Sequence, residues 1–270
     1  MPAAAALRQK IEFDLKERFP AALSPAPRAS HEVAHTGIDA VDRVLEGGLP
    51  LGAICEITGP ACSGRTSLAL AFLAQRTDEG RVCAWVDNND ALDPESAAAS
   101  GVNLKQLLWV RCGDERLRAA RRAGRFGIRE GSRPWARLDQ ALRATDLLLQ
   151  AGGFAAIVLD LADTAVEHGG RIPLATWFRF RQAADRTRCC LLVLGKAAYS
   201  QSSAALELQC LPARAETAGD TVLRGFRYEL RRGRQRFFLG APGARKLPAS
   251  TWSASTAWKP ETWCDAEERA

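Results

Sequence analysis

One short stretch limits the possible folds of this chain more than any other. The segment from Gly59 to Ser67 reads Gly-Pro-Ala-Cys-Ser-Gly-Arg-Thr-Ser, with an apolar run at 53–58 before it and another at 68–74 after it. A strand, a glycine-rich loop and a helix in this order form the setting of a phosphate-binding loop, or P-loop. The glycines let backbone N–H groups turn toward phosphate oxygens, and the start of the helix adds partial positive charge. We therefore expect a nucleotide site at this loop.

The loop departs from the usual pattern at its most demanding position. In G-x-x-x-x-G-K-[ST] the lysine reaches the β- and γ-phosphates, and here that position holds Arg65. Arginine keeps the positive charge but lacks the compact ammonium of lysine. Thr66 has the hydroxyl that would bind Mg²⁺. The candidate nucleotide-binding residues of the loop are Gly59, Pro60, Ser63, Gly64, Arg65, Thr66 and Ser67.

A second feature supports a metal–nucleotide site. Residues 154–159 are apolar, and Asp160 follows them directly. At the carboxyl end of a strand beside a P-loop, such an aspartate holds the water shell of Mg²⁺. The alternative is an aspartate that only caps a turn. Because a P-loop lies upstream, we favour the first interpretation and expect ATP with Mg²⁺, the metal being bound through Thr66 and Asp160.

The composition argues against several classes of protein. No apolar run approaches the roughly 18 residues of a membrane helix, and the N-terminus reaches charged residues too soon for a signal peptide. The eight cysteines form no C-x-x-C pair, and the chain has three histidines, which argues against a zinc site. We expect one large cytoplasmic domain with extensions and reduced cysteines. Its net charge of +6 is compatible with an acidic partner, nucleic acid included.

Periodicity predicts an α/β fold with a mainly parallel central sheet. Continuous apolar runs are typical of buried parallel strands, and they lie at residues 53–58, 81–87, 107–110, 154–160 and 189–194. Helical patterns alternate with them at 68–75, 95–99, 138–151 and 174–184.

Two further segments alternate polar and apolar positions, at residues 206–211 and 225–230. Such segments predict half-exposed antiparallel edge strands. Residues 231–236 are expected to form a hairpin turn, in which Arg231 and Arg232 are candidates for contact with a neighbour's phosphates. Near the start of the core, Thr36 or Asp39 is expected to cap a short helix.

The two ends of the chain are expected to lie outside a core of residues 31–240. Residues 4–18 predict an amphipathic helix that packs on a neighbouring subunit, on a partner or on its own domain, and a linker follows to residue 30. Residues 241–270 predict a flexible tail rich in Pro, Ala and Ser. Its tryptophans suit peptide docking, and the alternative is a tail that folds back over the core.

An arginine-rich insertion is expected at residues 111–137. It has nine arginines against three acids, an excess equal to the net charge of the whole chain. It is either a basic loop that contacts phosphates or an acidic protein, or a solvated surface insertion. The candidate contact residues are Arg118, Arg121, Arg122 and Arg125.

The order of these segments resembles the core of the RecA recombinases over residues 36–109. The matching sequence segments include Gly47-Gly48-Leu49-Pro50, Glu56-Ile57-x-Gly59-Pro60 and Ala91-Leu92-Asp93-Pro94. The helix and strand that lead to Asp160 are also similar to the family. The resemblance implies a RecA-like P-loop core with antiparallel strands at the edge of a parallel sheet.

Departures from the family pattern affect the implied chemistry. Asn89 stands where the family has the glutamate that activates water, and an amide cannot take a proton at pH 7. Lys196 replaces a glutamine that senses the γ-phosphate, and Arg65 replaces the P-loop lysine. Residues 161–172 and 197–203, which correspond to the family's DNA-binding loops, are shortened. We therefore expect weak or absent ATP hydrolysis, so it is uncertain that the protein is an enzyme.

RecA-like proteins with such losses include the ImuA-type accessory factors of translesion mutagenesis. The segment Leu107-Leu108-Trp109-Val110-Arg111-Cys112 and the short size of the chain are most similar to that group. That resemblance implies an adaptor in DNA repair and the SOS response. Its partners would be an inactive Y-family polymerase homologue of the ImuB type and an error-prone C-family polymerase, with RecA, DNA or a second copy as further candidates. The alternatives are a working RecA-type ATPase that binds single-stranded DNA, and a regulator of RecA.

Overall fold

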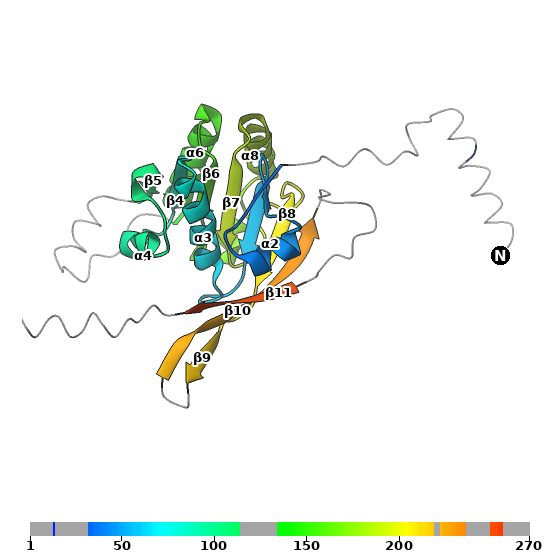
Figure 1. Cartoon of the computed structure of the whole chain (residues 1–270). Helices are drawn as coiled ribbons and strands as arrows, with labels where there is room; N and C mark the ends of the chain where they lie inside the picture. The colour runs from blue at the N-terminus through cyan, green and yellow to red at the C-terminus, as the bar shows by residue number, and fades with distance from the viewer. Residues whose placement is uncertain (1–12, 14–31, 114–133, 219–221, 236–248, 256–270) are drawn as a thin grey trace, which may run out of the picture.

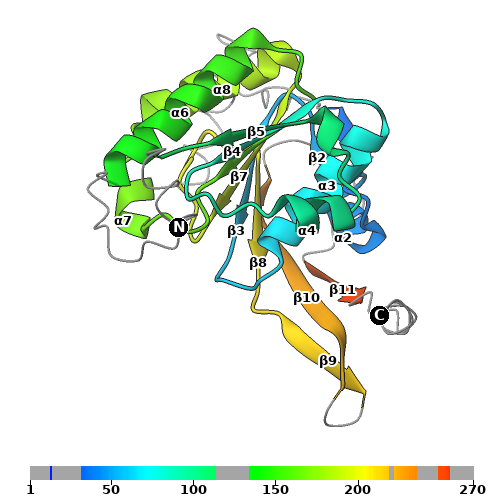
Figure 2. The same ribbon diagram turned by 90° about the vertical axis from the view of Figure 1, so that its left-hand side faces the viewer.

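A nine-stranded sheet between two helical layers forms the body of the molecule (Figures 1 and 2). The computed structural model describes residue 13 and residues 32–113, 134–218, 222–235 and 249–255. The strand order is β11-β10-β8-β3-β7-β6-β4-β5, and β9 pairs with β10 off this path. The predicted α/β fold with a mainly parallel central sheet and antiparallel strands at one edge is confirmed.

The parallel part of the sheet contains the predicted apolar runs. It consists of β3 (Ile54–Thr58), β4 (Cys83–Asp87), β5 (Leu107–Arg111), β6 (Ala156–Asp160) and β7 (Cys190–Gly195). Four of these strands are buried throughout, as continuous apolar runs predict. The exception is β5, which lies at the end of the sheet with Leu108 44% exposed, so the prediction of a buried strand at 107–110 is wrong.

The antiparallel part lies at the other end of the sheet. It consists of β8 (Leu206–Cys210), β9 (Arg214–Ala218), β10 (Val222–Gln235) and β11 (Ala249–Ser255). Strand β8 joins the two parts, because it pairs parallel with β3 and antiparallel with β10. Beyond it, β9 and the start of β10 extend away from the body of the molecule (Figure 2).

Two predictions for this part are corrected. Residues 231–236 were expected in a hairpin turn, but β10 continues to Gln235, because Arg231, Arg232 and Gln235 pair with β8 across a shift in register. Residues 249–255 were expected in a flexible tail beyond a core that ended at 240, but they form β11 against β10. Trp252 of β11 is 8% exposed and belongs to the core, which explains why this stretch is held in place.

The helices cover both faces of the sheet (Figure 2). On one face lie α2 (Asp39–Leu45), α3 (Arg65–Asp78) and α4 (Pro94–Ala99), and on the other lie α6 (Pro134–Ala151) and α8 (Leu174–Thr187). The short elements are β1 (Val33–Ala34), β2 (Leu49–Pro50), the 3₁₀ turn η1 (Leu104–Gln106) and α7 (Val166–Gly169), which lies within the predicted loop 161–172.

Each face of the sheet has its own hydrophobic core. Trp85 of β4 packs with Phe72 of α3 on one side, and its neighbours Ala84 and Val86 belong to the core of the other side. Successive side chains of a strand point to opposite faces, so one apolar run supplies both cores. The second core contains Trp177 and Phe180, both fully buried on α8.

The N-terminus of α4 has a side-chain cap, whereas the cap predicted for α2 is absent. Asp93 caps α4, because its carboxylate accepts the N–H groups of Glu95 and Ser96 and Pro94 starts the helix. By contrast, the N-cap of α2 is Ile38, with no side-chain hydrogen bond, so the expected cap by Thr36 or Asp39 is wrong. The Thr36 backbone N–H instead donates to the Asp42 carboxylate.

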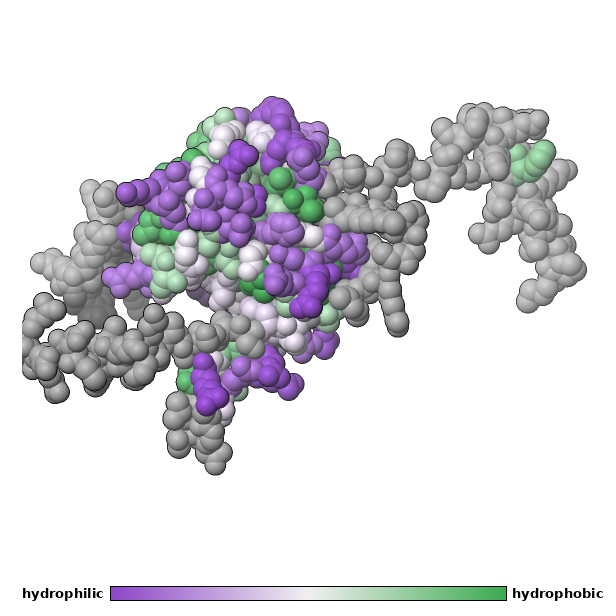
Figure 3. Space-filling view, in the orientation of Figure 1, coloured by the Kyte–Doolittle hydropathy of each residue, from purple (hydrophilic) through white to green (hydrophobic). Residues whose placement is uncertain are grey.

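Several predicted features lie outside the described residues: the N-terminal helix at 4–18 except Phe13, the arginines at 118, 121, 122 and 125, and the tail after 255. The space-filling view shows a mainly polar surface with small hydrophobic areas among the polar ones (Figure 3). Among the helices that the structure describes, none is long and apolar enough to cross a bilayer.

Candidate nucleotide-binding site

The P-loop lies where the parallel strands end. It leaves the carboxyl end of β3 and enters α3 at Gly64, which has a left-handed backbone with φ of +86°. In the sheet, β3 is next to β7, and β7 is next to β6, so the last residues of these strands, Thr58, Gly195 and Asp160, meet at one edge. This edge is where open α/β sheets bind their ligands.

Arg65, the most unusual residue of the loop, points inward. It is 6% exposed, and its Nη1 donates to the carbonyl oxygen of Gly195 at 2.6 Å. The backbone N–H of Gly59 donates to the same oxygen at 3.2 Å. One carbonyl of β7 therefore holds both ends of the P-loop, and the guanidinium is already bound within the chain.

An aromatic wall supports the loop from the side of β10. A Cβ atom at Gly64 would come within 2.5 Å of the Tyr228 ring, so only glycine fits there. The ring of Tyr228 stacks on Trp252, with centroids 5.2 Å apart and planes 29° from parallel. The start of α3 is thus packed against residues from the last two strands of the sheet.

The backbone of the loop retains the shape that suits a phosphate. Cys62 adopts a left-handed conformation with φ of +57°, and the first turn of α3 leaves Thr66 and Ser67 exposed. The hydroxyl of Ser63 is buried and has no hydrogen-bond partner among the described residues. A buried hydroxyl without a partner costs free energy, and a phosphate oxygen would satisfy it. These residues fit a phosphate group, whereas the guanidinium of Arg65 is engaged elsewhere.

Asp160 ends β6 in a strongly perturbed environment. Burial, and then the nearby charges of Asp87 and Asp163, raise its pKa to about 6, although the Ala162 N–H and Arg65 act in the opposite direction. The described residues hold no group of three or more His, Cys, Asp or Glu that could bind a metal. Mg²⁺ needs only one or two protein oxygens beside phosphates and water, so Asp160 with Thr66 fits that ion.

Asp87, at the end of β4, organises the neighbouring loop. Its carboxylate accepts the backbone N–H groups of Asn89, Ala91 and Leu92, and also the indole N–H of Trp109. Four donors on one buried carboxylate fix the path of residues 88–92. The segment Ala91-Leu92-Asp93-Pro94 therefore has a structural reason: it ends this loop and starts α4.

The same loop carries the amides at the site. Asn88 is 4% exposed and donates to the Thr164 hydroxyl at 2.9 Å and to the Asn89 side chain at 3.4 Å. Asn88 is thus held between β4 and β6, because the carbonyl of Asp160 accepts its backbone N–H, and Asn89 beside it donates its backbone N–H to the Asp87 carboxylate. An amide at this place can orient a water molecule but cannot take its proton.

A buried glutamate positions the loop that follows β7. Glu56 in β3 is 2% exposed, and its Oε1 accepts the backbone N–H groups of Tyr199 and Ser200 at 2.6 and 2.8 Å. Burial raises the pKa of Glu56, while these hydrogen bonds lower it. Lys196, between Gly195 and this anchor, is exposed. Glu56 thereby fixes the loop after β7 at Tyr199 and Ser200, four and five residues beyond the strand end.

The structure brings together most of the predicted site and adds residues that the sequence did not single out. Residues 59–67, Asp160, Asn89 and Lys196 all lie at one edge of the sheet. Gly195, Glu56 and Tyr228 were missed, because their roles depend on pairings between distant strands. A glycine at the end of an apolar run was the only local signal for Gly195.

The two predicted contact residues of β10 differ from each other. Arg231 is exposed and pairs with Glu229. The side chain of Arg232 is 7% exposed and donates to the Val44 carbonyl at 2.9 Å and to Glu46 at 3.3 Å. Arg232 therefore stabilises α2 against the sheet and is not part of an exposed basic surface.

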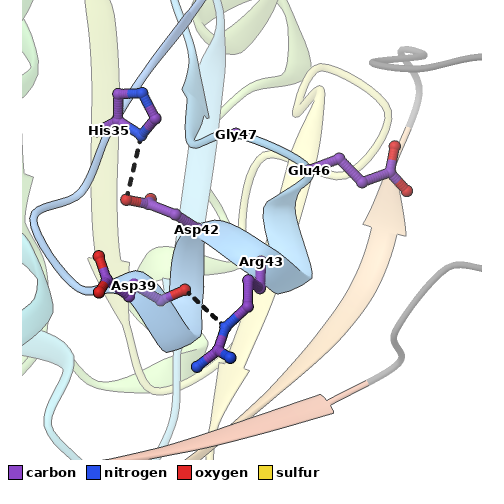
Figure 4. Close-up of a pocket in the computed structure, with 6 residues that line it drawn as sticks. All are labelled: His35, Asp39, Asp42, Arg43, Glu46 and Gly47. Atoms are coloured by element: carbon purple, nitrogen blue, oxygen red, sulfur yellow. Dashed lines mark hydrogen bonds and ion pairs between the residues drawn. The ribbon is translucent and has the colours of Figure 1, made fainter.

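A separate shallow pocket of about 640 Å³ lies beside α2 (Figure 4). It is lined by His35, Asp39, Asp42, Arg43, Glu46 and Gly47, and Nδ1 of His35 lies 3.4 Å from Asp42. His35 is 73% exposed, so this is a solvated surface contact. Nothing in this pocket adds to the site at the strand ends.

Comparisons with known proteins agree with this geometry. The family described as the RecA N-terminal domain matches residues 9–119. Protein RecA of Crocosphaera subtropica is 45% identical over 86 residues, which are 32% of this chain and 25% of that protein. Protein RecA of Rickettsia canadensis is 34% identical over 158 residues, which are 58% of this chain and 39% of that protein.

The fold comparison covers more of the chain. The crystal structure of the RadB recombinase matches with a TM-score of 0.51 and 16% identity, covering 80% of this chain and 94% of that one. At this identity the likeness concerns the fold alone. The strand order, the P-loop and Asp160 define a P-loop core. Together with the sequence matches, they show that this core is RecA-like, as the resemblance implied.

Proposed function

We propose that this protein is a RecA-like accessory factor in DNA repair and SOS-type translesion mutagenesis that hydrolyses ATP weakly or not at all. The observation that carries the proposal is the hydrogen bond from Arg65 to the Gly195 carbonyl. In a working P-loop the basic side chain is available to the phosphates. Here it is buried and bound to the backbone, so contact with a phosphate requires that this bond be broken.

The neighbouring groups support the same conclusion. Asn89 offers no base for an attacking water, and Lys196 is a point charge where the family has an amide. Ser63, Thr66 and Asp160 still suit ATP with Mg²⁺, and bound Mg²⁺ would neutralise charge on the phosphates. The chemistry therefore favours nucleotide binding with little turnover.

The partners of the proposed adaptor follow from the resemblance to ImuA-type proteins. They would be an inactive Y-family polymerase homologue and an error-prone C-family polymerase, with RecA as a further candidate. The chain spans less than half the length of the curated relatives that it matches, 39% in the case of the Rickettsia protein. Activities of those whole proteins, such as strand exchange, are not needed for this role.

An ATPase assay with and without single-stranded DNA tests the proposal. We expect no DNA-stimulated turnover above that of an Asp160→Ala control. Arg65→Lys should raise the affinity for a fluorescent ATP analogue about tenfold, because a lysine does not make the same contact with Gly195. Clear DNA-stimulated hydrolysis that disappears in Asp160→Ala would show a working ATPase and contradict the adaptor role.

The partner role needs a separate measurement. Purified full-length protein should co-elute with the Y-family polymerase homologue encoded in the same genome, and Asp160→Ala should co-elute equally well, since the contact does not depend on nucleotide. Failure to co-elute at micromolar concentrations would remove this partner from the proposal.

A further inference from the structure

The layer of α6, α7 and α8 has an unusual number of exposed apolar side chains. Of the eleven large apolar side chains exposed in the described residues, five lie on this layer. They are Trp135, Leu147, Val166, Leu174 and Phe178, at 38%, 69%, 47%, 48% and 50% exposure, and we call them the α6–α8 surface. Large apolar side chains exposed together on one layer of a protein are a common feature of contact sites.

The two long helices form one continuous support for this surface. They lie side by side on the same face of the sheet (Figure 2), and Arg179 of α8 bonds to Asp146 of α6 at 3.0 Å. Leu147 follows Asp146, and Phe178 precedes Arg179, so both lie at the level of this ion pair. Both helices are anchored on their inner side, because Trp177 and Phe180 of α8 and Leu138 and Leu149 of α6 are buried.

Arginines lie over both exposed rings. Arg181 is 5.9 Å from the Phe178 centroid, and Arg171 is 5.9 Å from the Trp135 centroid. Neither arginine has a carboxylate within ion-pair distance among the residues that the structure describes. Cations that are held in place beside apolar groups, and not neutralised, suit an acidic occupant with aromatic anchors.

The mixture of side chains favours a peptide over a nucleic acid. Nucleic-acid strands bind through stacking of bases on aromatic rings, with cations along the backbone. Leu147, Val166 and Leu174 offer no stacking surface, yet they are among the most exposed apolar groups of the protein. Aliphatic and aromatic side chains together, with a charged rim, are typical of protein contacts.

One segment of this chain has the complementary chemistry. Residues 256–270 contain Trp258 and Trp263, and tryptophan is enriched among the residues that dominate binding energy. They also contain four carboxylates against one lysine and one arginine. Fully extended, such a segment spans roughly 50 Å, which exceeds the roughly 27 Å length of an 18-residue helix such as α6.

We propose that residues 256–270 bind the α6–α8 surface, with their tryptophans against Leu147 and Phe178 and their carboxylates beside Arg171 and Arg181. The segment is that of a second copy of this chain. Within one chain Trp258 follows Ser255 of β11 by only three residues, which span about 10 Å, and β11 lies at the far end of the sheet from β6 and β4, on which α6 packs. The contact is independent of the nucleotide site, which lies at the edge of the sheet.

A binding experiment on the full-length protein tests this contact. The receptor is the full chain with Trp258→Ala and Trp263→Ala, which leaves its own segment unable to compete. The probe is a fluorescein-labelled synthetic peptide of residues 256–270, followed by anisotropy. We expect saturable binding that weakens at least about tenfold when the receptor also carries Leu147→Asp and Phe178→Asp.

The control is Leu104→Asp, because Leu104 is 42% exposed and lies on η1, which packs beside α4 and not on the layer of α6 and α8. It should leave the peptide affinity unchanged. Equal affinity for the Leu147→Asp, Phe178→Asp receptor would overturn the proposal, as would loss of binding in the control. A fluorescein-labelled dT20 that binds in place of the peptide, and is lost in the same variant, would also overturn it by showing a nucleic-acid surface.

A second measurement leaves the surface unaltered. Hydroxyl-radical footprinting compares the full wild-type chain with the Trp258→Ala, Trp263→Ala chain. We expect oxidation of Leu174 and Phe178 to increase several-fold when the tryptophans are removed. Identical oxidation in the two chains would overturn the proposal even if the Asp variants failed to fold.

Discussion

The strand-end site and the α6–α8 surface deal with their charged and polar groups in opposite ways. At the site, Arg65, Asp87 and Glu56 are buried and bound by groups of the same chain. On the helical layer, Arg171 and Arg181 rest on exposed rings without a carboxylate among the described residues. A ligand at the strand-end site must displace hydrogen bonds within the chain. A partner on the α6–α8 surface would instead supply the carboxylates for its arginines. The comparison separates a region kept mainly for architecture from one available for recognition.

Among the variants that test this contrast, Asp87→Ala should cause the largest loss of stability. Removal of the carboxylate leaves three backbone N–H groups and the Trp109 indole without their acceptor. Unpaired buried donors cost about 1–3 kcal/mol each, partly relieved by water, so we expect a loss of about 4 kcal/mol in the free energy of unfolding. Urea denaturation measures it. Asp93→Ala, which removes an exposed helix cap, should lose much less, and similar losses would mean that the loop is not organised from Asp87.

Arg65→Ala should have the next largest effect. It removes a buried cation from the Gly195 carbonyl and from the neighbourhood of Asp160, and breaking such buried contacts costs about 3 kcal/mol. Arg232→Ala is the matched control, because Arg232 is also buried and also donates to a carbonyl. Both variants should lose stability in thermal melts, but only Arg65→Ala should change the affinity for an ATP analogue. A stable Arg65→Ala protein would show that the site is not held closed from within.

The Asp160→Asn variant tests the strand-end site through the pH dependence of the free energy of unfolding. The raised pKa means that folding disfavours the ionised carboxylate, so the wild type is penalised above pH 6 and regains stability as the pH falls and Asp160 takes a proton. The amide should therefore stabilise the protein on the order of 2 kcal/mol at pH 7.5. The gain should shrink below pH 6 and vanish below about pH 4. Denaturation at several pH values checks this, and a gain that does not depend on pH would refute the assignment.

The smallest effect is expected on the helical layer. Leu147→Asp and Phe178→Asp change exposed side chains, so each should alter the free energy of unfolding by less than about 0.5 kcal/mol. Trp177→Ala, beside Phe178 but fully buried, should lose about 4 kcal/mol. Large losses in the two Asp variants would mean that their side chains support the fold and are not free for recognition.

Much of the architecture could be predicted from local patterns. The five apolar runs each place a parallel strand, and the glycines of 59–64 and the apolar stripe after them give the loop and α3. The position of β5 at the sheet edge could not be predicted, because Leu107 to Val110 are apolar whichever strands flank them. Residues 249–255 were assigned to a tail because they contain Ser, Thr and Ala. Their place in the sheet depends on pairing with β10 and on Trp252.

The site shows the same division between local and distant causes. Replacement of lysine by Arg65 could be read from the motif, and Asn89 and Lys196 from the resemblance. The engagement of Arg65 could not, because its acceptor belongs to a strand far along the chain. Arg231 and Arg232 look equivalent in sequence, but one is exposed and the other is bound under α2. Composition identifies charge, and only tertiary pairing decides whether that charge is available.

The shared acceptor at Gly195 has a consequence for the order in which the protein is made. Strand β3 is flanked by β7 and β8, and both are synthesised long after the P-loop has left the ribosome. The nascent loop therefore has neither its neighbouring strands nor the carbonyl that holds its two ends. A fragment that stops at residue 119, the limit of the RecA N-terminal match, would contain the whole motif without the partner that gives it shape. The candidate nucleotide site of this chain is therefore completed late in folding, although its sequence motif lies near the beginning.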